Sequence, residues 1–337
     1  MSAAPLPGLA GFRSALIVKP SSLGDIVHTL PAVQALRAAF PHLRIRWLAN
    51  TEWTPLLLDN PAVDEVIAFP RKTFRSLSGL ARFAAWARQW RKLPRPQPEI
   101  ALDFQGLLRS AVLARLSGAC PVVGLSDSRE GARLLHDHVV AVDAGDHALD
   151  RNLALVRAFG IEPATLETPL PTGSRPAGWP ERDDVLVVHP WSRGRGKSLA
   201  PEVLQALCDA LAPAPVALVG LPGHEPLPRG DHLIDLSGRT SLPELVWCLR
   251  QARAVISVDS GPMHIAAAIN PRTLGIHTWS DPRQVGPHAP TARVWKAGHI
   301  AARGDFTPGE CAGTQVPGID DARRLADFAR NWPTERA

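Results

Sequence analysis

The amino-acid sequence predicts an α/β protein with two doubly wound parallel sheets, each in a domain of its own. Short apolar runs rich in β-branched residues alternate with helical patterns in both halves of the chain, which is typical of parallel sheets. A segment rich in Pro, Gly, Ser and Thr interrupts this alternation at 162–179, and the alternation restarts after it. The length of 337 residues also suits two domains, since one domain usually has about 100–200 residues.

The first half begins with a strand pattern at 14–18, which is followed by a loop at 19–25 and a helical pattern at 26–40. A second strand is predicted at 44–48, and such a strand–helix–strand unit is the building block of a parallel sheet. Further strands are predicted at 66–69, 100–103, 122–124 and 139–142. We therefore expect a first Rossmann-like domain over residues 1–170.

The segment at 162–179 is the expected linker, because Pro and Gly interrupt regular structure. After it, the same kind of alternation predicts a second Rossmann-like domain over residues 180–316. Its strands are predicted at 185–188, 216–220, 254–258 and 273–277, and its helices at 201–211, 242–251 and 262–269. A last helical pattern at 319–331 predicts that residues 317–337 form a C-terminal helix, which can pack back on the first domain.

Composition excludes several classes of protein. The mean hydropathy is −0.03, and no stretch approaches the about 18 consecutive apolar residues of a membrane-spanning helix, so a polytopic membrane protein is excluded. The first residues lack the basic and apolar regions of a secretory signal, and we therefore expect a cytoplasmic protein. No CxxC pair occurs, which argues against a zinc site or a disulfide framework and favours four isolated buried thiols (Cys120, Cys208, Cys248 and Cys311).

The net charge of +5 and the isoelectric point near 9.4 indicate an anionic partner. Residues 71–95 carry eight Lys or Arg and no acidic residue. At about 100° per residue, the cations fall on one face of a helix and Phe83, Trp86 and Trp90 on the other. Such a helix is attracted to an anionic surface such as lipid phosphates; a merely solvated helix is the alternative, although it usually mixes both signs of charge. No nucleic-acid-binding motif accompanies the charge, so no nucleic-acid partner is expected.

Ligands of parallel α/β folds bind where strands end and helices begin. The first loop in such a place, at 19–25, contains Ser22, Gly24 and Asp25. Gly24 would let the backbone approach a ligand, and Asp25 would present a carboxylate that accepts a proton from a hydroxyl group. The alternative is purely structural, with Ser22 or Asp25 capping the helix that follows.

A second loop, at 258–264, also follows a strand and opens a helix. The backbone N–H groups of Ser260 and Gly261 would point toward an anion, which is the design of a phosphate site. Asp259 would then lie near a ribose or a sugar, and His264 one helical turn further on. A strand-to-helix loop of this composition also occurs for structural reasons alone.

A third loop, at 189–197, is basic and rich in glycine but lacks the spacing of a P-loop. Its Arg193 and Lys197 could neutralise a diphosphate leaving group, and a solvated basic loop is the alternative. After the next predicted strand, Glu225 could bridge the hydroxyls of a ribose.

In the first half, Gln105 follows the strand at 100–103, and Arg129 and Arg133 lie in a loop further along the chain. Arginine binds carboxylates and phosphates through two parallel hydrogen bonds, so both arginines are candidates for binding an anionic substrate. Ordinary exposed surface residues are the alternative.

Three stretches carry a family resemblance: ALIVKPSSLGDIVHTLPAVQALRAAFP at 15–41, ALDFQGLLRSAVLARLSG at 101–118 and ISVDSGPMHIAAAINPRTLGIHTWSDP at 256–282. Together, and in this order, they resemble the ADP-heptose:lipopolysaccharide heptosyltransferases, a family of two-domain GT-B glycosyltransferases. DSREGARLL at 127–135 and the basic Trp-containing helix resemble the heptosyltransferase I type, which adds the first heptose to the inner core.

The resemblance implies a GT-B fold, with two Rossmann-like domains facing a central cleft and binding the acceptor and the nucleotide-sugar donor respectively. It implies inverting transfer of heptose from ADP-heptose to a hydroxyl of the Kdo/heptose inner core of lipopolysaccharide. Asp25 matches the general base, and Lys197 matches the lysine that assists departure of ADP. The implied donor-binding residues are Ser192, Arg193, Glu225, Asp259, Ser260, Gly261 and His264, and the implied acceptor-binding residues are Ser22, Gly24, Gln105, Arg129 and Arg133.

The resemblance implies no tightly bound cofactor and no metal, which agrees with the lack of a metal-ligand cluster in the sequence. The expected partners are the nucleotide-sugar donor and an anionic glycolipid acceptor. The basic helix at 71–95 is expected to contact the inner leaflet of the cytoplasmic membrane, and the protein is expected to be a monomer. Two positions depart from the family pattern: Ser198–Pro201 follows Lys197 where a Trp-Pro pair is usual, and Ser260 replaces the commoner threonine. The alternatives are a transferase of the same family that uses another sugar nucleotide, or a protein or small-metabolite acceptor, and a non-catalytic sugar-nucleotide-binding protein.

Overall fold

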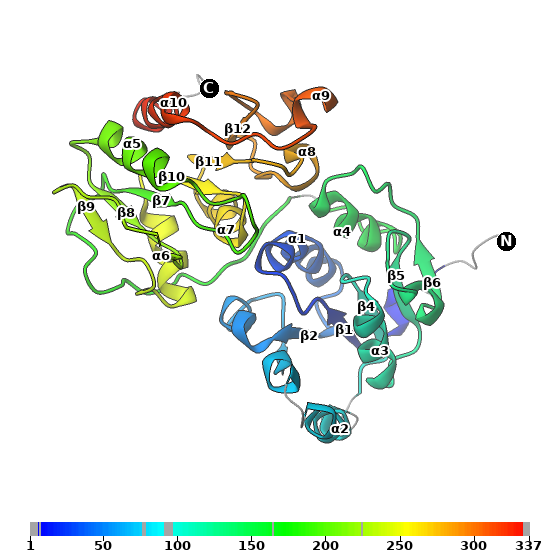
Figure 1. The fold of residues 1–337 in the computed structure, drawn as a ribbon. Coiled ribbons are helices and arrows are strands. Elements are labelled where there is room, and N and C mark those ends of the chain that lie inside the picture. Colours follow the sequence, from blue (N-terminus) through cyan, green and yellow to red (C-terminus); the bar gives the residue numbers. More distant parts are fainter. Residues whose placement is uncertain are drawn as a thin grey trace. The chain divides into compact units, whose positions relative to one another are not determined.

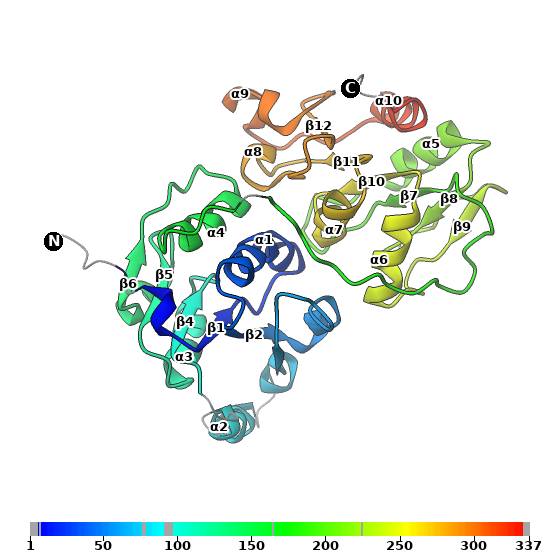
Figure 2. The same ribbon diagram turned by 180° about the vertical axis from the view of Figure 1, so that it is seen from behind.

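The computed structural model describes residues 6, 8–75, 79–90, 97–163, 165–223 and 225–332. Contacts within the chain divide it into two units, Met1–Pro171 and Thr172–Ala337, so the division falls inside the Pro- and Gly-rich segment (Figure 1). Each unit consists of one sheet with helices packed on it, and Figure 2 gives the view of both sheets from behind.

The sheet of unit 1 has six strands in the order β3-β2-β1-β4-β5-β6, and all neighbouring strands are parallel. This order is that of a Rossmann-like sheet. The strands are β1 (Ser14–Val18), β2 (Arg44–Asn50), β3 (Glu65–Phe69), β4 (Ile100–Asp103), β5 (Val122–Leu125) and β6 (His138–Val140). The helices are α1 (Leu23–Ala39), α2 (Gly79–Trp90), α3 (Leu108–Leu116) and α4 (Ala148–Arg157), with 3-10 helices η1 (Leu9–Gly11), η2 (Thr51–Leu56), η3 (Arg71–Arg75) and η4 (Ala132–Leu135).

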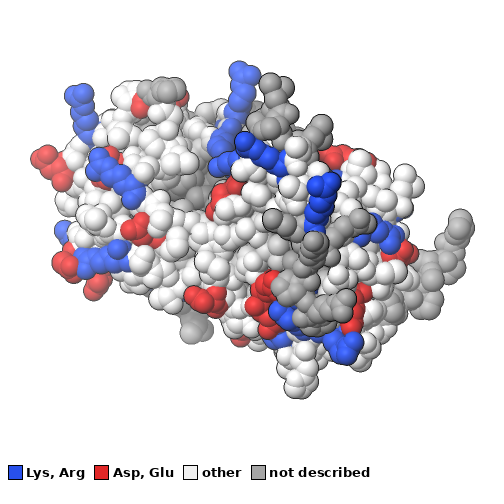
Figure 3. Space-filling model, turned by 90° about the horizontal axis from the view of Figure 1, so that it is seen from below, with Lys and Arg blue, Asp and Glu red and all other residues white. Residues whose placement is uncertain are grey.

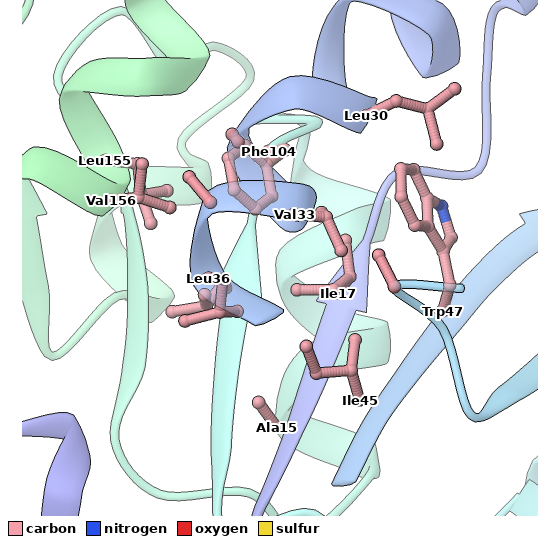
Figure 4. Packing of buried hydrophobic residues seen from close by; sticks show 14 of the residues in the cluster. Ala15, Ile17, Leu30, Val33, Leu36, Ile45, Trp47, Phe104, Leu155 and Val156 are labelled. Atoms are coloured by element: carbon pink, nitrogen blue, oxygen red, sulfur yellow. The ribbon is translucent and has the colours of Figure 1, made fainter. Parts of the chain in front are cut away.

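Alternate residues of β1 face opposite sides of this sheet, and helices cover both sides. Ala15 and Ile17 pack in a core with α1 and α4, whereas Leu16 and Val18 pack in a second core with α2 and α3. Figure 4 shows side chains of the first of these cores. A strand that is buried on both faces is apolar at almost every position, which is why its sequence identifies it without any alternation.

The sheet of unit 2 has seven strands in the order β13-β12-β11-β10-β7-β8-β9, and only the pair β12–β13 is antiparallel. The strands are β7 (Leu186–His189), β8 (Val216–Leu218), β9 (Leu233–Asp235), β10 (Ala254–Val258), β11 (Thr273–Ile276), β12 (Arg293–Lys296) and β13 (His299–Ala301). The helices are α5 (Pro201–Leu211), α6 (Leu242–Gln251), α7 (Gly261–Ile269), α8 (Pro282–Val285), α9 (Pro308–Cys311) and α10 (Ile319–Arg330), with one 3-10 helix, η5 (Arg303–Asp305).

The C-terminal helix α10 packs on α5 of its own unit. Ala322, Leu325, Ala326 and Ala329 recur at helical spacing and are buried in the core that also contains α5. The apolar stripe of α10 is buried against α5. Whether this helix also packs back on the first domain, as expected from the sequence, stays a prediction.

The amphipathic helix predicted within 71–95 is confirmed for its described part, α2. Its aromatic face packs inward, because Trp90 is buried in the second core and Trp86 stacks on it with ring centroids 5.2 Å apart. Unit 1 therefore covers the face that would otherwise insert into a bilayer, while Arg82 and Arg88 are exposed. Outside the described residues lie Arg91, Lys92, Arg95 and the side chain of Arg75.

No helix among the described residues is long and apolar enough to cross a membrane. Three of the four cysteines are buried, as the sequence analysis expected. Cys120 is exposed, because it lies in the turn that leads into β5 and not in an element of the core.

Candidate active site

In both sheets the strand order reverses beside the first strand of the unit, and doubly wound folds bind their ligands at this switch point. The switch point lies between β1 and β4 in unit 1, and between β7 and β10 in unit 2. The loops that follow these four strands, together with the first turns of the helices after them, contain both residues predicted as catalytic and most of those predicted to bind a substrate.

Asp25 lies in the first turn of α1, just after the loop that follows β1. Its Oδ2 accepts hydrogen bonds from the backbone N–H of Ser22 at 2.8 Å and from the Ser22 hydroxyl at 2.6 Å. These contacts form a capping box, so the capping role considered for this pair is confirmed, and the helix begins at Leu23 instead of the predicted Ile26. The same contacts fix a carboxylate at the switch point of unit 1.

Lys19, which the sequence analysis did not single out, is a buried cation at the carboxyl end of β1. Its ammonium group donates a hydrogen bond to the backbone oxygen of Phe104 at 2.7 Å, which ties the loops after β1 and β4 together. Burial lowers the pKa of Lys19, and the carboxylates of Asp25 and Asp103 act against that shift. A charged residue directly after an apolar strand is the sequence signal that could have revealed it.

The turn after β4 is held by the buried Asp103. Its Oδ1 accepts the backbone N–H of Gln105 at 3.0 Å, and its Oδ2 lies 3.0 Å from the hydroxyl of Ser110 and 3.1 Å from Nε2 of His136. The side-chain oxygen of Gln105 in turn accepts the backbone N–H of Ser21 at 3.1 Å. The structure therefore brings Gln105 to the loop that contains Ser22.

The loop after β5 approaches the same turn. The backbone N–H of Arg129 donates to the carbonyl of Gly106 at 2.7 Å. Gly106 has φ of +64°, and a Cβ at this position would lie 2.8 Å from the hydroxyl of Ser128, so glycine allows the approach. Arg129 and Arg133 are both exposed, and Arg133 lies in η4.

In unit 2, Lys197 and Asp259 form an ion pair across the switch point. Nζ of Lys197, from the loop after β7, lies 2.5 Å from Oδ2 of Asp259, which follows β10. The two side chains are 17% and 6% exposed. Nζ also lies 4.3 Å from the ring centroid of Trp279, a residue after β11. The structure therefore places Lys197 at the switch point of unit 2, and its role in the departure of ADP stays a prediction.

Asp259 is ionised at neutral pH although it is buried. Burial by itself would raise the pKa of Asp259, but the neighbouring His277, His264 and Lys197 outweigh it and hold this pKa near 2. Ser280 also donates its hydroxyl to Oδ2 of Asp259 at 2.5 Å. Burial lowers the pKa of His277 to about 4, so the residue that carries the balancing positive charge at neutral pH is Lys197.

Helix α7 begins at this ion pair without a side-chain cap. Ser260 is its N-cap residue, but the Ser260 hydroxyl donates to the carbonyl of Val258 at 3.0 Å and lies 3.2 Å from Nδ1 of His189, and no side chain caps the helix. The N–H groups of the first turn can therefore bind an anion. Gly261 lies in this turn and His264 one turn further, and the latter's Nε2 is 3.9 Å from Oδ1 of Asp259.

The two glycines expected to bind substrates lie at helix starts. Gly24 and Gly261 each lie in the first turn of a helix, and neither is among the glycines with positive φ. Gly24 is buried in α1, so it does not present its backbone to a ligand as expected, whereas Gly261 is half-buried at the start of α7.

The remaining donor-binding candidates flank the ion pair. Ser192 is half-buried and its backbone N–H donates to the hydroxyl of Ser198 at 2.9 Å, which closes the loop that carries Lys197. Arg193 is exposed on the same loop. Glu225 is exposed after β8, one strand further from the switch point.

The sequence profile of one family, described as "Glycosyltransferase family 9 (heptosyltransferase)", matches residues 86–184 and 220–310, which together make up more than half of the chain. The chain belongs to glycosyltransferase family 9. The family and the class of enzyme predicted from the sequence are thereby confirmed. The matched residues include Gln105 and Asp259, whereas Asp25 and Lys197 lie outside them.

Two relatives of this family 9 glycosyltransferase are lipopolysaccharide heptosyltransferases. The lipopolysaccharide heptosyltransferase 1 of Pseudomonas aeruginosa is 28% identical, with 94% of this chain and 92% of that protein covered. The lipopolysaccharide heptosyltransferase 1 of Escherichia coli K12 is 26% identical, with 84% of this chain and 93% of that protein covered.

Solved structures confirm the GT-B fold of the glycosyltransferase. The E. coli heptosyltransferase WaaC with ADP has a TM-score of 0.72 at 21% identity, covering 94% of this chain and 99% of its own. The E. coli ADP-heptose lps heptosyltransferase II has a TM-score of 0.69 at 19% identity, covering 94% of this chain and 99% of its own.

Proposed function

We propose that this glycosyltransferase transfers a heptose from ADP-heptose to a hydroxyl of the lipopolysaccharide inner core, with inversion at the anomeric carbon. The names of the two heptosyltransferase relatives support the sugar and the acceptor, and the structures determined with ADP and with ADP-2-deoxy-2-fluoro heptose support the donor. The observation on which the donor site rests is the Lys197–Asp259 pair beside the uncapped start of α7.

The diphosphate of the donor binds at α7 in this proposal. Backbone N–H groups of its first turn, together with the helix dipole, favour the negative charge. Lys197 adds a full positive charge that can move from Asp259 to a phosphate oxygen as the bond to the sugar breaks. Glu225 then accepts hydrogen bonds from the ribose hydroxyls on the β8 side.

Asp25 acts as the general base. The acceptor hydroxyl attacks the anomeric carbon from the face opposite to the diphosphate, its proton passes to the carboxylate of Asp25, and the bond between the carbon and the phosphate oxygen breaks to release ADP. One displacement of this kind inverts the configuration at the carbon. Gln105, Arg129 and Arg133 are placed along the loops after β4 and β5, where they can bind carboxylate or phosphate groups of the acceptor.

Nucleotide binding tests the donor assignment. We expect ADP to raise the melting temperature of the protein by several degrees, and GDP and UDP to raise it much less at the same concentration. At 100 times its dissociation constant a ligand adds about 2.7 kcal/mol to the free energy of unfolding, which is enough for such a shift in domains of this size. Equal shifts with all three nucleotides, or none with any, would contradict an ADP-sugar donor.

We further propose that α2 attracts the protein to anionic lipid headgroups by charge alone. Arg82 and Arg88 are exposed, and neither forms an ion pair with a described residue. On the face drawn in Figure 3, blue and red side chains are interspersed over the described part.

Charge reversal tests this attraction. Each basic residue near a membrane surface contributes about 1 kcal/mol, so Arg82→Glu/Arg88→Glu should lower binding to phosphatidylglycerol vesicles at low salt by about 30-fold or more. The control is Arg323→Glu/Arg324→Glu, which makes the same change of charge on the exposed side of α10. Equal binding of the two variants would leave α2 without a role at the membrane.

A further inference from the structure

Trp279 is an exposed aromatic residue at the ion pair of unit 2. Its side chain is 49% exposed, although a large indole ring is usually more buried than this. The residue follows β11, which pairs with β10, the strand that ends at Asp259. Nζ of Lys197 lies 4.3 Å from the centroid of its ring.

The loop that carries Trp279 is firmly held. The next residue, Ser280, donates its hydroxyl to Asp259 at 2.5 Å and lies 3.0 Å from Nδ1 of the buried His277. The backbone on both sides of Trp279 is therefore fixed by buried groups. Its indole lies beside Lys197 on this held backbone.

The strand order places Trp279 relative to the parts of the donor. Across the middle of the sheet the order is β11-β10-β7-β8, so the loops that carry Trp279 and Glu225 lie on opposite sides of the switch point. If the diphosphate lies at α7 and the ribose on the side of Glu225, as in the proposed function, the transferred sugar extends toward β11. Trp279 is then the aromatic residue next to the sugar.

We propose that the indole of Trp279 forms the floor of the sugar subsite of the donor, so that Trp279 is a specificity-determining residue. This inference rests on the proposed function. A pyranose ring presents a face of C–H groups, and such a face packs against the negative face of an aromatic ring while its hydroxyls stay available for hydrogen bonds. The Lys197 ammonium, already against this ring, can leave it for the phosphate oxygens, because charge-assisted bonds to phosphate are stronger than a cation–π contact.

The test separates binding of the sugar from binding of the nucleotide. Dissociation constants for ADP and for ADP-heptose are measured by calorimetry, without acceptor, for the wild type, Trp279→Ala, Trp279→Phe and the control Trp332→Ala at the end of α10. Trp279→Ala should raise the ratio of the ADP-heptose constant to the ADP constant by about tenfold, which is the upper range for an aromatic contact. Trp279→Phe should keep this ratio close to the wild-type value, because phenylalanine also presents an aromatic ring. Trp332→Ala should leave the ratio unchanged.

Each other outcome overturns the inference in a recognisable way. An equal loss for ADP and ADP-heptose in Trp279→Ala would mean that Trp279 acts on the nucleotide, through Lys197 or directly. Unchanged dissociation constants for both ligands would mean that the sugar does not touch the ring. A wild type that binds ADP but not ADP-heptose would refute the proposed function itself, and the sugar subsite with it.

Discussion

Asp25→Asn is expected to lower kcat for sugar transfer by about 10²–10⁴-fold, because an amide cannot accept the proton of the acceptor hydroxyl. The amide oxygen can still accept the two hydrogen bonds from Ser22, so the start of α1 should survive the change. Affinity for ADP should stay within about twofold of the wild type, since no group of the ADP site is altered. Steady-state release of ADP and calorimetric binding of ADP measure the two quantities.

The control for Asp25→Asn is Glu244→Gln. Ser241 and Glu244 form the same kind of capping box at the start of α6, with both hydrogen bonds from Ser241 to Oε2 of Glu244 at 2.7 Å. This variant removes a capping-box charge without touching the proposed base, and its kcat should stay within about twofold of the wild type. If Asp25→Asn behaves in the same way as the control, Asp25 is a helix cap and not the base.

Lys197→Met is expected to lower kcat by about 10²–10³-fold, the loss that follows removal of one group that stabilises a developing negative charge. Methionine keeps most of the length and the apolar stem of lysine but cannot donate to the departing diphosphate. The variant should also be less stable by about 3 kcal/mol, at the lower end for a broken buried ion pair because Lys197 is partly exposed. The melting temperature of Lys197→Met at neutral pH, compared with that of the wild type, measures this loss of stability.

The stability change has a definite dependence on pH. The pKa of Asp259 is near 2 in the folded protein, below the usual value of about 3.9, so its ionised form stabilises the fold above pH 4 and this contribution is lost as the pH falls toward 2. In Lys197→Met the stabilisation by ionised Asp259 is smaller, because its partner cation is missing. The wild type and Lys197→Met should therefore differ less in free energy of unfolding at pH 3 than at pH 7. Lys197→Arg keeps the charge and should retain more of both the stability and the turnover. Turnover of Lys197→Met within threefold of the wild type would contradict the role in departure of ADP.

Much of the fold could be predicted because buried parallel strands are apolar on both faces. Strands such as β1 and β10 therefore stand out as short runs, and β1 was predicted with its observed ends. The strand β12 was missed, since it ends in Lys296, a charged residue that is buried only because its ammonium donates to the carbonyl of Thr278 at 2.6 Å. The strands β9 and β13 have three residues each at the edges of the sheet, which is too short for a pattern.

Those residues of the candidate site that come after predicted strands could be identified from the sequence. Asp25, Gln105, Lys197 and Asp259 all lie between the end of a strand and the first turn of the next helix, and helix starts favour anions there. Which loops meet depends on the order of the strands, and the sequence does not contain that order. The contact between Lys197 and Trp279 arises because β11 is the neighbour of β10, although 82 positions separate the two residues, and it became visible only in the structure.

Transfer by the wild-type protein tests the central claim most directly. The protein is incubated with ADP-heptose and a Kdo-bearing lipid A acceptor, and the configuration of the new glycosidic bond is read by nuclear magnetic resonance. We expect one ADP to be released for each heptose transferred. The anomeric configuration of the new glycosidic bond should be opposite to that of the donor. A product with the donor's configuration, or release of ADP with no sugar on the acceptor, would contradict the central claim.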